Sequence, residues 1–175
     1  SPGQILYSSS GNGSAPHLSM AQLIALTGIN IVHIPYKGGP PAVTAIVAGE
    51  TQAMTATLAT VLPLIKGGRL RLLAMTSAQR LKLMPEVPPL AESGVPGYEM
   101  SPWIAVFAPA GTPKQVVDKL NGEIAKALRL SDVQQNLAGQ ALEAITATPE
   151  EFASRVKSDY EKYAKLIRMA GARIE

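Results

Sequence analysis

The chain has 175 residues, of which 46% are apolar and 17% charged, with no cysteine and only two histidines. This composition excludes a disulfide scaffold, a Cys-ligated metal site and a thiol nucleophile, and two histidines are too few for a histidine metal cage. The net charge of +3 is unevenly spread, because residues 1–65 hold one cation, Lys37, and one anion, Glu50. That first third is expected either to be covered by other protein or to bind a ligand through amides and hydroxyls.

Strands and helices alternate over the first 77 residues. The chain begins at Ser1 without an initiator Met or a signal peptide, as expected of a piece cut from a longer protein. Strands are expected over 5–7, 29–34, 51–56 and 70–76, and helices over 14–28, 42–49 and 58–65, followed by Gly67 and Gly68. This alternation predicts an α/β fold with a mostly parallel sheet flanked by helices.

The remaining sequence predicts a loop-rich stretch, a strand and three helices. The loop covers 79–102 and the strand 103–108, and a second short strand is an option over 141–145. Capping boxes predict the three helix starts, at Thr112 with Gln115, Ser131 with Gln134, and Thr148 with Glu151, and Gly171 is expected to end the last helix. The first and last of these helices are amphipathic. We expect one domain over 1–102, and a return strand with C-terminal helices over 103–175.

One candidate site follows the first strand. The serine–glycine loop is expected to contribute Ser8, Ser9, Ser10, Gly11, Asn12 and Gly13. It lies between a strand end and a helix start, where amides, hydroxyls and the partial positive charge of the helix favour an anion. The sequence predicts a carboxylate or phosphate cradle here. An ordinary turn whose Ser and Asn cap the helix explains the same residues.

Two further loops follow the next strands, at the same expected sheet edge. The second strand is followed by Tyr36, Lys37 and Gly38, and the third by Thr55, Ala56 and Thr57. Lys37 is expected either to pair with an acidic ligand or to be solvated. The two threonines are expected either to donate hydroxyls to the ligand or to end a strand and cap a helix.

Several other kinds of site lack their motifs. Pro16 occupies the last glycine position of a dinucleotide fingerprint, and no lysine follows to complete a phosphate-binding P-loop. A serine triad has only His17 or His33 available, no Gly-x-Ser-x-Gly elbow and no acid before Glu50. His17 is expected to cap the helix or contact the ligand, and His33 to be a satisfied core residue. No enzyme activity, cofactor or metal is predicted.

A nucleic-acid partner is also not predicted, although the sequence pI is about 9.2. The basic residues alternate with acidic ones along amphipathic segments, and the chain has only eight aromatic residues, counted as one Trp, five Tyr and two Phe. Solvated helix faces explain this pattern better than a nucleic-acid surface.

The order of short motifs resembles one receptor family. The motifs are YSSSGNG at 7–13, VHIPYKG at 32–38, LPLIKGGRLR at 62–71, LAMTS at 73–77, PGYE at 96–99 and APAGTP at 108–113, with His17, Leu18 and Trp103. Together they span nearly the whole chain and resemble the second domain and C-terminal region of the tripartite tricarboxylate transporter receptors, also called the Bordetella-uptake-gene type.

The resemblance implies a function and a fold. Such receptors are periplasmic, are not enzymes, and close two α/β domains of the type II periplasmic-binding-protein kind on a small carboxylated solute. They deliver the solute to the subunits of a membrane permease. The implied ligand contacts are the serine–glycine loop with His17 behind it, the loop at 36–38 and the loop after Met54.

Two departures from the family pattern have consequences. Members commonly carry an aromatic residue and then Asp where this chain has Thr55 and Ala56, so we expect a solute without an essential ammonium group. The motifs cover only the family's second domain and C-terminal region, so we expect the C-terminal helices of this piece to lack the surface on which they normally lie. We expect weak solute binding by this piece alone, and a homodimer or domain swap, or refolding of the helices onto the α/β unit.

Two alternatives remain open on the residues alone. One is a small α/β hydrolase or transferase that uses Ser10 or a neighbouring serine as nucleophile. The other is a structural or oligomerisation module without a ligand. The sequence does not name the solute.

Overall fold

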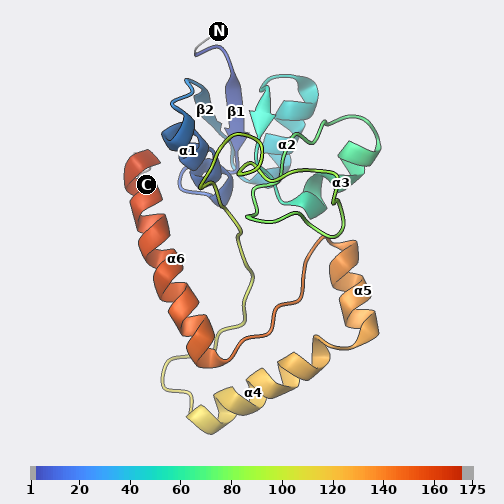
Figure 1. The fold of residues 1–175 in the computed structure, drawn as a ribbon, viewed down its shortest axis with the longest axis vertical. Helices are drawn as coiled ribbons and strands as arrows, with labels where there is room; N and C mark the ends of the chain where they lie inside the picture. Colours follow the sequence, from blue (N-terminus) through green and yellow to red (C-terminus); the bar gives the residue numbers. More distant parts are fainter. Residues whose placement is uncertain (1–2, 171–175) are drawn as a thin grey trace. The chain divides into compact units, whose positions relative to one another are not determined.

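Three parallel strands form the sheet (Figure 1). The computed structural model describes residues 3–170. β1 (Leu6–Ser9) lies in the middle, between β2 (Val32–Pro35) and β3 (Ala53–Met54), and pairs with both in parallel. The predicted α/β class with a parallel sheet is therefore confirmed.

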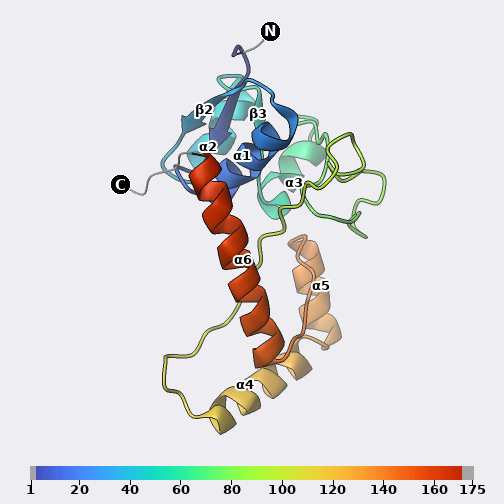
Figure 2. The same cartoon turned by 60° about the vertical axis from the view of Figure 1, so that its left-hand side comes forward.

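Helices connect the strands on both sides of β1. α1 (Ala15–Thr27) and α2 (Gly39–Ala48) both contact β1, and α3 (Leu58–Lys66) follows β3 (Figures 1 and 2). The chain passes from the middle strand to one edge and then back across to the other edge. Right-handed crossovers in this order place α1 and α2 on opposite faces of the sheet. The direction of winding reverses between β1 and β3, which makes that point the topological switch of the sheet.

Local signals set the ends of these helices. The Ser14 hydroxyl accepts a hydrogen bond from the His17 N–H at 3.5 Å, and Pro16 occupies the first turn of α1. Gly28 and Gly49 end α1 and α2 with φ angles of 69° and 80°, in the left-handed region that glycine adopts without strain. The predicted ends of both helices are confirmed.

A small apolar core covers α1. It consists of Leu18, Val95, Tyr98, Met100 and Leu166. Tyr98 is 1% exposed, and its hydroxyl donates to the Ser19 carbonyl at 3.0 Å and lies 2.6 Å from the Ser19 Oγ. The loop-rich stretch that contains Tyr98 is thus fastened to α1 by both packing and hydrogen bonds.

The expected strand over 70–76 is wrong. Among the described residues of this segment, only Met75 forms a bridge, with Pro89. A strand requires a neighbour that pairs with successive residues, and here one residue finds such a neighbour. Leu73 is 72% exposed and Met75 is 6% exposed, although residues two apart would lie on the same face of a strand.

The described chain divides into two compact units. One unit runs to Pro102 and resumes at Tyr163, and the other is Trp103–Lys162. The expected strand over 103–108, which opens the second unit, is wrong, as is the optional strand over 141–145. Among residues 3–170, neither segment has a strand beside it to pair with its backbone groups. Ile104 and Val106 are 87% and 77% exposed.

The second unit contains α4 (Lys114–Ala127), α5 (Ser131–Gly139) and most of α6 (Pro149–Ala170). α4 and α5 have no buried side chain among their described residues. Trp103 contacts Phe107 and Phe152, at ring-centroid distances of 6.4 and 5.0 Å. This unit therefore has an aromatic cluster and little other core.

Only one of the three predicted capping boxes forms. The Thr148 N–H donates to the Glu151 carboxylate at 2.8 Å, and the Glu151 N–H donates to the Thr148 hydroxyl at 3.1 Å. The other two are wrong, because α4 and α5 are preceded by Pro113 and Leu130, which offer no side-chain acceptor. The expected stop at Gly171 lies outside the described residues.

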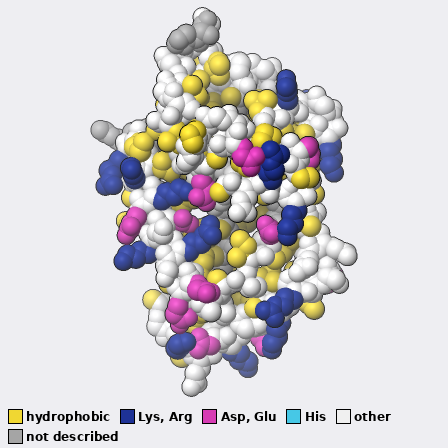
Figure 3. All heavy atoms as spheres, viewed as in Figure 1, with side chains coloured by type: hydrophobic (Ala, Val, Ile, Leu, Met, Phe, Trp, Pro, Cys, Tyr) yellow, Lys and Arg dark blue, Asp and Glu magenta, His cyan; other side chains and the backbone are white. Residues whose placement is uncertain are grey.

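Charged side chains of the second unit pair locally. Lys114 bonds to Asp118 at 2.8 Å, and Lys126 to Glu123 at 2.8 Å. Figure 3 shows Lys and Arg interspersed with Asp and Glu over the face it presents. This distribution agrees with solvated helix faces of mixed charge.

Candidate functional site

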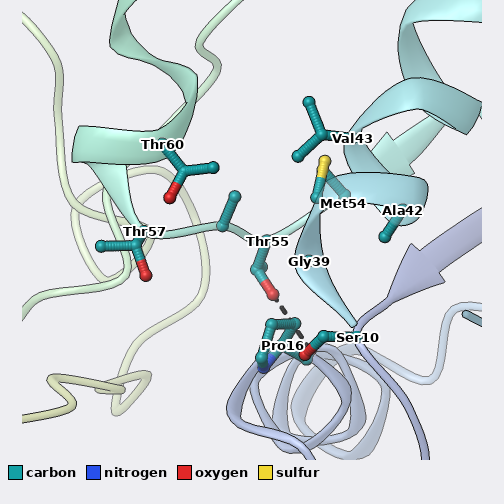
Figure 4. Close-up of a pocket in the computed structure, with 10 residues that line it drawn as sticks. Ser10, Pro16, Gly39, Ala42, Val43, Met54, Thr55, Thr57 and Thr60 are labelled. Atoms are coloured by element: carbon teal, nitrogen blue, oxygen red, sulfur yellow. Dashed lines mark hydrogen bonds between the residues drawn. The ribbon is translucent and has the colours of Figure 1, made fainter. Parts of the chain in front are cut away.

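A pocket of about 170 Å³ lies where β1 and β3 end (Figure 4). The residues that line it are Ser10, Pro16, Gly39, Ala42, Val43, Met54, Thr55, Ala56, Thr57 and Thr60. They come from the carboxyl ends of the two strands and from α1, α2 and α3. The pocket therefore occupies the topological switch point, where open α/β sheets bind ligands.

Three helices begin at this pocket. Pro16 lies in the first turn of α1, Gly39 is the first residue of α2, and Thr57 directly precedes α3. Within the part of the chain that the structure describes, no side chain caps the N-terminus of α2 or of α3. The N–H groups and partial positive charges at helix starts attract anions. The pocket can accept an anion although its lining contains no lysine or arginine.

The lining combines hydroxyls with apolar side chains. The hydroxyl-bearing residues are Ser10, Thr55, Thr57 and Thr60. The Thr55 hydroxyl donates to the Pro16 carbonyl at 3.0 Å, so its proton is already used (Figure 4). Val43 and Met54 lie together, away from Ser10. The arrangement provides hydrogen-bond donors for a polar group and an apolar surface for a hydrocarbon segment.

Ser8 and Ser9 are not part of the lining. Both are fully buried, and the Ser8 hydroxyl donates to the Ala42 carbonyl at 3.2 Å. The Ser9 Oγ lies 2.6 Å from the His33 Nε2 and accepts a hydrogen bond from the Gly11 N–H at 3.2 Å. These hydroxyls serve the internal structure of the loop.

Two histidines lie stacked behind the serine–glycine loop. The ring centroids of His17 and His33 are 4.0 Å apart and the rings are inclined by 10°, and the Tyr7 ring stacks on His33 at 4.8 Å. The His17 Nδ1 accepts a hydrogen bond from the Gly13 N–H at 3.0 Å. Burial lowers the pKa of His17, and burial together with the charge of His17 lowers the pKa of His33 to about 4.

The other predicted site residues lie outside the pocket lining. Tyr36 donates to the Glu50 carboxylate at 3.2 Å, and Lys37 and Asn12 are exposed. Gly38 precedes α2 with a φ of 105°, a conformation that favours glycine. Of the thirteen predicted residues, the structure brings Ser10, Thr55, Ala56 and Thr57 together around one pocket.

Sequence reasoning missed several lining residues. They are Pro16, Ala42, Val43 and Thr60, and Gly39 and Met54, which adjoin the predicted loops, also line the pocket. The sequence offered a signal that Gly39 and Thr60 lie near the site, because both lie in the first turn of a helix that follows a strand end. The apolar side chains had none, since Val43 and Met54 resemble ordinary core residues in the sequence.

Two structural features are absent from residues 3–170. Within that range no three His, Cys, Asp or Glu side chains gather closely enough to hold a metal ion. Across the same residues, no helix combines the length and the apolar character that a bilayer crossing needs.

Comparison with known proteins decides the family. The model of the tripartite tricarboxylate transporter family receptor matches residues 1–172. The chain belongs to this family. A Pseudomonas sp. (strain P51) protein from the tcbD-tcbE intergenic region is 40% identical over 167 residues, which cover 95% of this chain and 50% of that protein. This receptor chain thus spans about half the length of that relative.

Solved receptor structures share the fold. R. palustris Rpa4515 with adipate superimposes with a TM-score of 0.87 at 32% identity, over 98% of this chain and 57% of that one. MatC from Rhodopseudomonas palustris with bound malate superimposes with a TM-score of 0.77 at 27% identity, over 94% of this chain and 57% of that one. The family consists of periplasmic solute-binding receptors rather than enzymes.

Proposed function

We propose that this chain is the ligand-facing domain and C-terminal region of a longer receptor that captures a small carboxylated solute. The observation that carries the proposal is the pocket at the switch point, where three helix starts and four hydroxyl residues meet without a charged lining residue. Adipate and malate, which accompany two similar receptors, are both dicarboxylates. The receptor would act in the periplasm and pass its solute to the subunits of a membrane permease.

The contacts with the solute are assigned to residues of the lining. Ser10 and Thr57 donate hydroxyl hydrogen bonds to a carboxylate, and the Gly39 N–H faces it from the start of α2. Thr55 and Ala56 complete the wall without an acidic side chain, so the solute needs no ammonium group. In this proposal residues 1–102 form the ligand-facing domain, and the region 103–175 belongs with a first domain.

A serine hydrolase is the weaker candidate. The serine beside a histidine is Ser9, which is fully buried and therefore out of reach of a substrate. The lowered pKa of its partner His33, at about 4, makes that ring a weak base. Ser10 lines the pocket, yet its side chain has no recorded bond to a histidine among the described residues.

A thermal melt with matched solutes tests the proposal. Adipate and malate are expected to raise the melting temperature of the full-length receptor, and the neutral diamide of adipic acid is not, because only the carboxylates carry the charge that the helix starts attract. This 175-residue chain alone is expected to bind more weakly. The proposal would be overturned if adipate and its diamide raised the melting temperature equally, or if neither compound raised it.

The exposed apolar side chains of the second unit carry a further prediction. Ile104, Val106, Phe107 and Ile145 are all more than two-thirds exposed. In the absence of a first domain, we expect the chain to form a homodimer or domain swap that covers them. Light scattering over a range of concentrations checks this, and a monomer at every concentration would contradict it.

A further inference from the structure

Two side chains accept hydrogen bonds from backbone N–H groups of the serine–glycine loop. The Gly13 N–H is bonded to the His17 Nδ1 at 3.0 Å, and the Gly11 N–H to the Ser9 Oγ at 3.2 Å. Gly11 and Gly13 have φ angles of 127° and 73°, which few other residues adopt. These two acceptors hold the N–H groups of both glycines, while the Gly11 carbonyl accepts from the Ser14 hydroxyl at 2.7 Å.

Both acceptors depend on the stacked histidines. His17 bonds to the loop itself, and His33 reaches it through Ser9, whose Oγ lies 2.6 Å from the His33 Nε2. The two rings are 4.0 Å apart. Ser10, which lines the pocket, lies within the loop that they hold. The geometry of the pair is thus connected to the pocket through backbone hydrogen bonds.

We infer that His17 and His33 are positioning residues, which hold the serine–glycine loop in its binding shape while both rings are neutral and release it when they are protonated. This inference rests on the proposed function, since the loop matters to a solute only through the pocket. It also replaces the expected contact between His17 and the ligand, because His17 is 6% exposed and absent from the lining.

Elementary chemistry explains the release. A protonated imidazole has a hydrogen on both nitrogens, so a charged His17 no longer accepts the Gly13 N–H. Two charged rings 4.0 Å apart also repel each other. The titratable groups that face the pair are the rings themselves, from α1 and β2, and the Tyr7 phenol of β1. Burial raises the pKa of Tyr7 to about 12, so it stays neutral throughout.

The direction of the pH effect follows from burial. Both histidines have a pKa below the usual 6.5, and that of His33 is about 4. In acid the unfolded chain takes up these protons before the folded chain does. The contribution of the two histidines to the free energy of unfolding is therefore fully present above about pH 6.5 and is lost as the pH falls toward 4. The loop is released in the same pH range, because the folded chain takes up its protons there.

Nuclear magnetic resonance of the whole 175-residue chain tests the inference directly. In the unaltered chain, the Gly13 amide should be protected from exchange at about pH 7 and lose protection with a midpoint below about 6.5. His17→Phe keeps a stacking ring but removes the acceptor, so Gly13 should exchange about tenfold faster at neutral pH.

His17→Asn is the matched control, because its Oδ1 offers an acceptor that does not titrate. We expect it to keep Gly13 protected and to remove the acid response there. Unchanged protection in His17→Phe, or an unchanged acid response in His17→Asn, would refute the positioning role. If His17→Phe does not fold, the pH titration of Gly13 protection in the unaltered chain and in His17→Asn still decides whether His17 has the positioning role.

Adipate, added to the full-length receptor at about pH 7 and about pH 5, separates this inference from the proposed function. Adipate is expected to shift the amide signals of Ser10 and Thr57, and these shifts should weaken in acid as Gly13 loses its protection from exchange. That result would support both the proposed function and the positioning role. If adipate shifts neither residue at either pH, the proposed function fails and the Gly13 result still decides the role of the histidines. If adipate binds equally at both pH values while the Gly13 bond is lost, the positioning role fails.

Discussion

Replacement of Tyr98 by alanine is expected to lower the free energy of unfolding by about 3 to 5 kcal/mol. The ring is 1% exposed and packs in the core beside Leu18 and Met100, so its removal leaves a cavity. The loss also leaves the buried Ser19 Oγ without the hydroxyl that lies 2.6 Å from it. Urea unfolding followed by circular dichroism measures the change.

Tyr98→Phe separates packing from hydrogen bonding. The ring stays, and the lost hydroxyl should cost about 1 to 3 kcal/mol, because buried groups of Ser19 lose their partner. Tyr160→Phe is the control, since Tyr160 is 75% exposed and its change should stay within about 0.5 kcal/mol. Equal effects of the two phenylalanine variants would show that the Tyr98 hydroxyl contributes nothing.

Replacement of Ala56 by aspartate is expected to weaken adipate binding by about tenfold to a hundredfold. Ala56 lines the pocket, so the new carboxylate would lie near a carboxylate of the solute and repel it. From the family resemblance, we expect aspartate at this position to favour solutes with an ammonium group instead. Calorimetry with the full-length receptor measures the affinity for adipate of the unaltered protein and of the Ala56→Asp variant.

Ala56→Asn provides the neutral comparison of nearly equal size. It should lose far less affinity, because it adds volume without charge. Neither change should reduce stability, since Ala56 lies just before the start of α3, where a negative charge is tolerated or favourable. Matching losses for Asp and Asn would mean that space, and not charge, governs this wall of the pocket.

Prediction from the sequence was most accurate where the cause is local. The ends of α1 and α2 follow from Gly28 and Gly49, and the start of α6 from the Thr148 and Glu151 pair. The failures involve distant partners. Residues 70–76 and 103–108 have strand-like sequences, yet a strand exists only when a neighbour accepts its backbone bonds.

The candidate site divides in the same way. The sequence by itself determined that polar loops follow β1, β2 and β3, because the positions of Gly, Ser and Thr are local properties of the chain. Only the tertiary structure decided that Ser10 and Thr57 line a pocket. It also decided that Ser9 is buried beside His33. The reason is geometric: adjacent residues at a strand end point in opposite directions, and their surroundings come from segments distant in the sequence.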